Sequence, residues 1–330
     1  MAKNNYQNLE KNEEEERKKR REKCYELLEL TCCLFIVLIL VALGLFLYVI
    51  YYAQKVPTDY TEQINTGGDI ESKYLAMGKY ETNYYEEETS STIAKKYLFY
   101  YPDEMEKYSI RKTYPVVIFA NSANSNAGKI KSLLNHMASW GFIAIGNYDE
   151  EYSYTGESSN LILNHIMELN ENDRSFFYHK VDLENIGITG HAPGGVGVFN
   201  AVTEGTNGKY YKCAVSISPT IKDFEMNVAA KFKPSSVKIP VMLLSETVDE
   251  VTTLDESLSY FLQIKTTRVF ARKKNTNHNE ILYNADGYVT SWFMHYLKQD
   301  EEAGLFIKGD NPELYNNTLY QDQQISIVNY

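Results

Sequence analysis

Apolar residues occur in one long run near the N-terminus and in many short runs after it. The long run, residues 31–52, contains no charged side chain. At about 1.5 Å per residue, a helix over this run would measure roughly 33 Å, and a bilayer core is about 30 Å thick. The pattern therefore predicts a transmembrane helix that follows a charged tail over residues 1–30.

Beyond residue 95, short apolar runs typical of buried strands alternate with stretches of helical spacing. The strand-like runs are 97–101, 116–120, 142–146, 186–190, 214–218, 241–245 and 268–272. The helical stripes are Leu133, Leu134, Met137 and Trp140, then Ile162, Ile166 and Leu169, then Val289, Trp292, Phe293 and Leu297. This alternation indicates a mostly parallel sheet with helices on both faces, so we expect a three-layer α/β domain.

The segment between the apolar run and the first strand-like run has a different composition. Residues 53–95 are rich in Thr, Glu, Tyr and Ser and lack apolar periodicity, which predicts a polar stalk that contains at most an early strand. We therefore expect four parts: a tail over 1–30, a membrane helix over 31–52, a stalk over 53–95 and one folded domain over 96–330.

Composition narrows the function classes. The chain has 33 basic and 44 acidic residues, a net charge of -11, so a nucleic acid would be repelled rather than gathered. A hydrophobic content of 44% excludes a disordered chain. Three of the four cysteines, Cys24, Cys32 and Cys33, lie near the N-terminus, so the domain, which holds only Cys213, has no disulfide framework.

The charges that flank the apolar run predict its orientation. Six basic residues lie within residues 17–23, whereas Lys55 is alone just after the run. By the positive-inside rule the N-terminus is cytoplasmic and the large C-terminal part is extracellular or luminal. The lipid bilayer is therefore an expected partner through residues 31–52, in the plasma membrane or an organelle membrane.

The sharpest local motif is IGITGHAPGG at residues 186–195, in which a buried strand meets a Gly-flanked turn and then a helix. This is the context of a nucleophile elbow, G-x-S-x-G. The turn is so tight that small residues are needed two positions on either side of the nucleophile, and Gly190 and Gly194 supply them. The nucleophile position itself is occupied by Ala192.

With these residues the sequence resembles the α/β-hydrolase superfamily, and more narrowly its cutinase, dienelactone-hydrolase and platelet-activating-factor-acetylhydrolase-like esterases. The resemblance covers about residues 96–322. It implies that YPVVIFAN leads into an oxyanion loop in which Ala123 gives a backbone N–H. It also implies Asp249 as the acid, with Glu246 and Glu250 as neighbouring alternatives, and His278 as the histidine, in the usual order along the chain.

Two adjacent residues depart from the family pattern. The alanine methyl of Ala192 cannot attack a carbonyl, and loss of a catalytic serine costs on the order of 10⁶ in kcat. Pro193 has no N–H for the second oxyanion position, which costs about 10² to 10³ more. A residue before proline also favours extended geometry, so we expect Ala192 to have lost the positive φ of an elbow.

Two hypotheses from different classes follow. The first is a pseudoenzyme that keeps the fold and serves as a binding or scaffolding subunit, with protein partners in a membrane assembly. The second is an active carboxylic ester hydrolase that uses Asp249 and His278 with water, or with Ser122 or Ser125 as a displaced nucleophile, on a small ester or acyl ligand. An introduced Ser-to-Ala replacement would also leave alanine at 192, but it would not require Pro193.

The remaining candidates are weaker. His136, His165, His179 and His295 show no metal-ligand spacing, so we predict neither a metal site nor a cofactor. Cys213 opens an apolar strand and is expected to be a buried thiol. Asn316 begins the chain's one glycosylation sequon, Asn316-Asn317-Thr318.

Overall fold

The computed structural model describes residues 2–53, 55–107, 112–122, 125–151, 153–203, 206–220, 232–248 and 251–328. It divides into two compact units, residues 1–55 and 56–330. The predicted residues Ala123, Asp249 and Glu250 lie outside the described parts of the chain.

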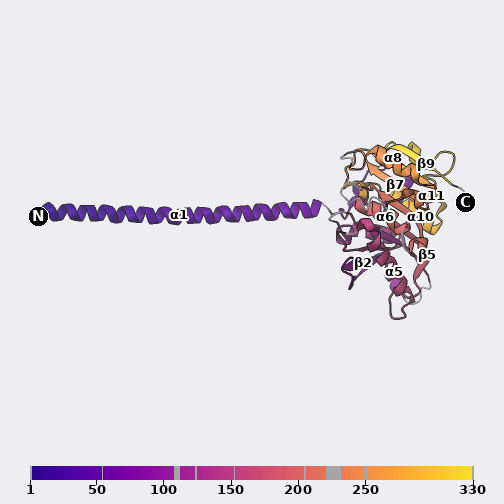
Figure 1. The fold of residues 1–330 in the computed structure, drawn as a ribbon, viewed down its shortest axis with the longest axis horizontal. Coiled ribbons are helices and arrows are strands. Elements are labelled where there is room, and N and C mark those ends of the chain that lie inside the picture. The colour runs from indigo at the N-terminus through magenta and orange to yellow at the C-terminus, as the bar shows by residue number, and fades with distance from the viewer. Residues whose placement is uncertain are drawn as a thin grey trace. The chain divides into compact units, whose positions relative to one another are not determined.

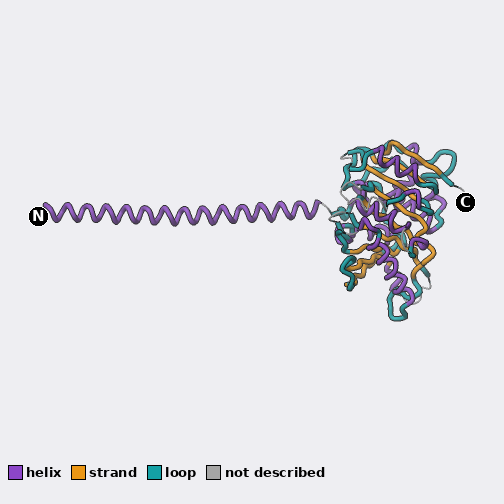
Figure 2. The backbone as a smooth tube through the Cα atoms, viewed as in Figure 1, coloured by secondary structure: helices purple, strands orange, loops and turns teal. Residues whose placement is uncertain are grey.

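The first unit is one helix, α1 (Ala2–Ala53), which Figure 2 shows without a break. Its apolar part is exposed along its length, and within the described residues it is the one helix that is long and apolar enough to cross a membrane. Ion pairs between residues four apart, Glu13 with Arg17 at 3.8 Å and Glu16 with Arg20 at 3.6 Å, support its charged part. The predicted apolar helix is therefore present.

The second unit is built on a nine-stranded sheet with the order β1-β2-β4-β3-β5-β6-β7-β8-β9. The strands are β1 (Thr82–Glu88), β2 (Lys96–Pro102), β3 (Tyr114–Ala120), β4 (Ile143–Asn147), β5 (Val181–His191), β6 (Tyr211–Ile217), β7 (Val241–Glu246), β8 (Arg268–Lys273) and β9 (Tyr320–Ser326). Six of them, β4-β3-β5-β6-β7-β8, are parallel, and the pairs β1/β2, β2/β4 and β8/β9 are antiparallel. In Figure 1 the labelled strands run in this order from β2 to the yellow β9.

Helices cover both faces of the sheet. The helices after α1 are α2 (Tyr60–Gln63), α3 (Asp69–Leu75), α4 (Lys131–Ser139), α5 (Glu157–Glu171), α6 (Pro193–Thr203), α8 (Leu254–Gln263), α9 (Ile281–Asn284), α10 (Asp286–Lys298), α11 (Glu301–Gly304) and α12 (Glu313–Asn316). Short 3₁₀ turns are η1 (Asp103–Glu106), η2 (Ala127–Lys129), η3 (Ser153–Thr155), η4 (Gly208–Tyr210) and η5 (Pro234–Ser236).

Two apolar cores lie on opposite faces of the sheet. Alternating residues of β3 show this, because Val117 and Phe119 join the core with α4 and α10, whereas Val116 and Ile118 join the core with α5, α6 and α8. Trp292 and Phe293 of α10 are fully buried in the first core. The expected three-layer α/β architecture, an α/β-hydrolase fold with a mostly parallel sheet, is confirmed.

All seven predicted strands are present, with ends that differ by a few residues. The sequence pattern predicts neither β9 nor the bounds of β1. These two strands are the edge strands of the sheet. Both carry mostly polar residues, TNYYEEE and YQDQQIS, and are only partly buried, so neither has the apolar run of a central strand. Cys213 is buried as expected.

The predicted polar stalk is wrong from Val56 onward. Val56, Tyr60 and Tyr74 are buried in the first core, and β1 pairs with β2 over its whole length. The polar residues of this segment find partners far along the chain: the Tyr60 hydroxyl donates to Asp286 at 2.5 Å, and Glu71 pairs with Lys273 at 2.5 Å. Contacts between residues more than 200 positions apart produce no local periodicity in the sequence. The polar composition of this segment therefore predicted, wrongly, that it is solvated.

The buried carboxylate of Asp286 generates a prediction about stability. It accepts from Tyr60 and lies 2.6 Å from His136 Nδ1, and all three side chains are buried. We expect Asp286→Asn to lower the free energy of unfolding by about 1–3 kcal/mol, because it replaces a buried acceptor oxygen with an amide and leaves a buried partner without its hydrogen bond. Urea unfolding of the full chain in detergent, followed by near-ultraviolet circular dichroism, measures this.

The control for this prediction is Asp59→Asn, which changes an exposed carboxylate directly before Tyr60. An exposed substitution of this kind changes stability by about 0.5 kcal/mol or less. Equal effects of the two variants would contradict a structural role for the buried pair.

Candidate active site

The turn between β5 and α6 has the geometry of an elbow. Ala192 alone separates the last residue of β5, His191, from the first residue of α6, Pro193. Ala192 has φ +53°, so the expected relaxed elbow is wrong. The Ala192 N–H donates to Ile217 O at 2.9 Å, and Ala192 O accepts from Val196 N at 3.3 Å. These bonds fix the turn and override the local preference of a residue before proline.

The two glycines of the motif are required by close backbone approach. A Cβ on Gly190 would lie 2.5 Å from Gly194 O, and a Cβ on Gly194 would lie 2.3 Å from Asn121 O. No side chain fits at these distances, so only glycine permits the turn to pack against the end of β3. The structure thus supports the spacing that the sequence predicts for Gly190 and Gly194.

Pro193 opens α6 and is buried. Proline is suited to the first position of a helix, because its fixed φ is helical and the N–H that it lacks would have no intrahelical acceptor. The same lack leaves no backbone donor at this position for an oxygen bound above Ala192. Pro193 therefore favours the start of α6 but removes a backbone donor from the site.

A Glu–His pair, in which Glu246 is buried and His278 part-buried, lies at or beyond the carboxyl ends of two other strands. Glu246 is the last residue of β7, and His278 lies between β8 and α9. Glu246 Oε1 is 2.9 Å from His278 Nδ1, and the Ser218 hydroxyl donates to Glu246 Oε2. Burial opposes ionisation of Glu246, but the hydrogen bonds from His278 and Ser218 outweigh it and lower its pKa below the ordinary value.

Within the described residues, Glu246 is therefore the carboxylate that orients His278. The sequence named Asp249 first and Glu246 as an alternative, and Asp249 lies outside the described residues. A signal for Glu246 was available: it directly ends the apolar run VMLLS, at the carboxyl end of a parallel strand, where functional side chains of open α/β sheets gather.

Sequence reasoning missed Ser218, which directly follows β6. It is fully buried, has φ +44° and donates to Glu246. Its N–H donates to Leu244 O at 2.8 Å, so the neighbouring strand β7 holds it in place. The only signal in the sequence is a serine at the end of a buried parallel strand.

His191 brings the elbow and the Glu–His pair together. Its ring lies 4.5 Å from that of His278, centroid to centroid, and its Nδ1 is 3.1 Å from Ser122 Oγ. Burial, with a further contribution from the neighbouring His278, lowers the pKa of His191 to about 3. The ring is therefore neutral at pH 7. Ser122 is part-exposed, whereas Ser125, the other serine considered as a nucleophile, is buried.

The side chain at the nucleophile position of this turn is the methyl group of Ala192, which cannot attack a substrate. An imidazole held by a buried carboxylate lies near a turn that has elbow geometry. At the elbow itself, Ala192 provides no nucleophile and Pro193 provides no backbone donor. Ser122 beside His191 is the one hydroxyl that these contacts place next to an imidazole of the site.

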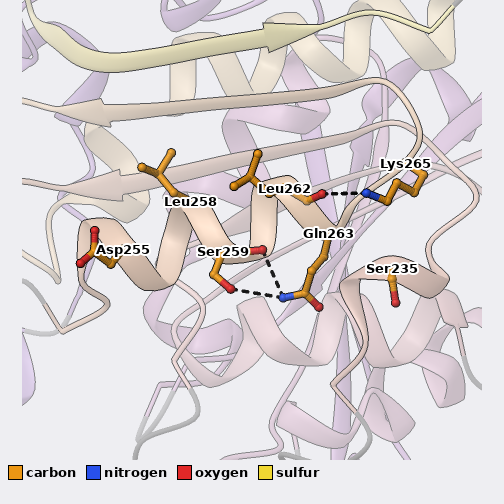
Figure 3. A pocket seen from close by; sticks show the side chains of 7 residues that line it. All are labelled: Ser235, Asp255, Leu258, Ser259, Leu262, Gln263 and Lys265. Carbon is orange, nitrogen blue, oxygen red and sulfur yellow. Dashed lines mark hydrogen bonds between the residues drawn. The ribbon is translucent and has the colours of Figure 1, made fainter.

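The hollow in Figure 3 lies elsewhere in the folded unit. It has a volume of about 600 Å³ and is lined by residues of α8 and η5 and by Lys265. Its lining includes Leu262, which is 61% exposed, and Lys265, whose Nζ donates to Leu262 O at 3.1 Å. No residue of the elbow or of the Glu–His pair borders it.

The described structure also shows the surroundings of the glycosylation sequon and of the His, Cys, Asp and Glu side chains. Asn316, at the end of α12, is exposed, and its Nδ2 donates to Asn311 Oδ1 at 2.9 Å. Groups of three or more His, Cys, Asp or Glu side chains arranged to hold a metal ion are absent from the described ranges.

Comparison with known proteins identifies one family. The family described as "PETase: PET hydrolase-like" matches residues 80–324, which include β1 and most of β9 as well as the elbow and the Glu–His pair. No curated protein matches the chain.

The low pKa of His191 predicts how stability depends on pH. Between the ordinary histidine value of about 6.5 and about 3, the unfolded chain binds a proton at this residue that the folded chain does not. Stability should therefore fall as the pH drops through this window. Between pH 6 and pH 5 the free energy of unfolding should fall with decreasing pH. We expect this fall to be smaller in His191→Gln by about 1.4 kcal/mol per pH unit.

The control is His179→Gln, since His179 is an exposed histidine. Thermal or urea unfolding of the full chain at each pH gives the slopes. An unchanged slope in His191→Gln, or an equal change in both variants, would mean that His191 is not buried in its neutral form.

Proposed function

The chain belongs to the PET hydrolase-like family of α/β-hydrolases, and we propose that it is a membrane-anchored pseudo-hydrolase that binds rather than hydrolyses. The observation that carries this proposal is Ala192 at φ +53°, in an elbow whose geometry is otherwise complete. The shape of the elbow and the hydrogen bonds that hold it are present, whereas position 192 carries no nucleophilic side chain. Ester substrates fit the family, so an ester or acyl ligand is the expected class of small molecule.

The oxyanion position strengthens the argument. In the proposed site, Ala123 would give one backbone N–H and residue 193 the other, but Pro193 has none. A bound ester would therefore find neither an attacking oxygen nor full stabilisation of a developing oxyanion. We assign the roles of acid and histidine to Glu246 and His278, on their 2.9 Å contact, with Asp249 as the alternative acid.

The anchoring is part of the proposal. The apolar part of α1 supports a single span with a cytoplasmic N-terminus, because the basic residues of 17–23 precede it. The folded unit would then be extracellular or luminal, in the plasma membrane or an organelle membrane. The exposed Asn316 is available for glycosylation in such a compartment. A protein that binds instead of catalysing would act as a subunit of a membrane assembly.

A second candidate function rests on Ser122. Its Oγ lies 3.1 Å from His191 Nδ1, within reach for proton transfer. With Nδ1 unprotonated, His191 would accept the hydroxyl proton as Ser122 attacked an ester, which would make the chain an active carboxylic ester hydrolase. The low pKa of His191, about 3, makes this imidazole a weak base, so we place the pseudo-hydrolase first.

Restoring the elbow tests the proposed function. We expect the native chain to be inactive on short-chain p-nitrophenyl esters and the double variant Ala192→Ser, Pro193→Gln to turn them over. Ala192→Ser alone should be about 10² to 10³ slower than the double variant, because Pro193 still withholds one donor. His278→Ala in the double background is the control and should abolish turnover. Hydrolysis by the native chain would contradict the pseudo-hydrolase proposal.

Labelling with a fluorophosphonate probe separates the second candidate from the first. A reactive serine is marked covalently, whereas an ordinary surface serine is not. We expect no label on the native chain. Label that disappears in Ser122→Ala and persists in Ser125→Ala would establish Ser122 as a displaced nucleophile.

A further inference from the structure

Helix α8 exposes leucine side chains beside the hollow of Figure 3. Leu262 is 61% exposed, more than any other large hydrophobic side chain that the structure describes in the folded unit. Leu258, one helical turn earlier, borders the same hollow and is partly buried. Other residues of the helix, Ser257, Tyr260 and Phe261, are the ones that it buries. The two leucines therefore form a short apolar ridge on the outside of the helix, which we call the α8 ridge.

Opposite charges lie at the two ends of the α8 ridge. Asp255 is exposed in the first turn of the helix, and Lys265 is exposed two residues past its end. The Lys265 Nζ donates to Leu262 O at 3.1 Å, which keeps the ammonium group at the end of the helix. Glu256, the other acid of the first turn, forms a capping box with Thr253. The ridge therefore runs from an exposed carboxylate to an exposed ammonium group.

These four side chains are placed symmetrically about Tyr260. Asp255 and Lys265 each lie five positions from it. Leu258 and Leu262 each lie two positions from it. An antiparallel second α8 that crosses near Tyr260 would set Asp255 of each copy beside Lys265 of the other. The same crossing would set Leu258 of each copy beside Leu262 of the other, whereas a parallel copy would set like charges side by side.

We propose that the α8 ridge is the interface of a homodimer, in which a second copy of this chain packs its own α8 antiparallel across it. Each copy uses the same surface, so association closes at two copies. Leu262 of each copy enters the hollow beside Leu258 of the other, and this burial supplies the apolar part of the interaction. The two pairs of opposite charge fix the orientation of the copies.

The proposed contact is separate from the candidate active site. Neither the elbow nor the Glu–His pair borders the hollow, so the inference holds whether or not the site hydrolyses esters. One helix from each copy is a small surface for a stable dimer, and exposed charge pairs add little to affinity. We therefore expect monomers and dimers in equilibrium in the micromolar range.

Sedimentation of the full chain in a density-matched detergent, at low ionic strength, measures this equilibrium. Leu262→Ser should raise the dissociation constant about tenfold or more, because it truncates the apolar side chain at the centre of the contact. The matched control is Leu305→Ser, which changes another exposed leucine, directly after α11, and should leave the constant unchanged.

Exchanged charges test the antiparallel arrangement. Asp255→Lys alone, or Lys265→Asp alone, sets like charges together at both ends of the contact, so each variant should associate about tenfold more weakly than the native chain. An equimolar mixture of the two variants restores both contacts of opposite charge, and it should associate as tightly as the native chain. Asp173→Lys, at an exposed residue between α5 and β5, is the control and should have no effect.

Three results would overturn the inference. One is a native chain that stays monomeric throughout the micromolar range or that assembles beyond two copies. Another is a dimer that Leu262→Ser leaves intact, because the contact would then lie on another surface. The third is a mixture of the two charge variants that associates no better than either variant alone, when circular dichroism shows both to be folded.

Discussion

The close approach of the β5–α6 turn to the end of β3 is the constraint on which the rest of the site depends. Gly190 and Gly194 leave no space for a side chain, since a Cβ at either would lie 2.5 Å or less from a backbone oxygen. With both glycines packed, the single residue between β5 and α6 must change the chain direction within one peptide. Ala192 is thereby forced to a positive φ, whatever its side chain can do.

Other contacts of the site follow from that turn. It places His191 beside the ring of His278, and the parallel register of β6 and β7 brings Ser218 to the carboxylate of Glu246. A carboxylate without exposed surface is costly unless it is paired, and here three donors, from His278, Ser218 and Val251, face its two oxygens. This arrangement does not depend on the side chain at residue 192, because none of these contacts involves it.

The sequence predicts well those features that local pattern determines. Central strands appear as apolar runs because both of their faces are buried, and α4 and α5 appear as apolar stripes because one face of each helix is buried. The failures share a cause. Glu71 with Lys273 and Tyr60 with Asp286 join residues more than 200 apart, so segment 56–75 has the composition of a solvated stalk. The φ of Ala192 and the partner of His278 are likewise set by neighbouring strands.

Strain at an active site is often taken as a sign of chemistry, and this elbow shows the limit of that inference. A non-glycine residue at positive φ costs of order 1–3 kcal/mol, and it persists only where the surroundings determine it. At Ala192 the surroundings are hydrogen bonds to Ile217 and Val196 and the packing of two glycines. These belong to the fold and would be the same with any small side chain. The strain therefore follows from the fold, whereas the chemistry of the site depends on the atoms at positions 192 and 193.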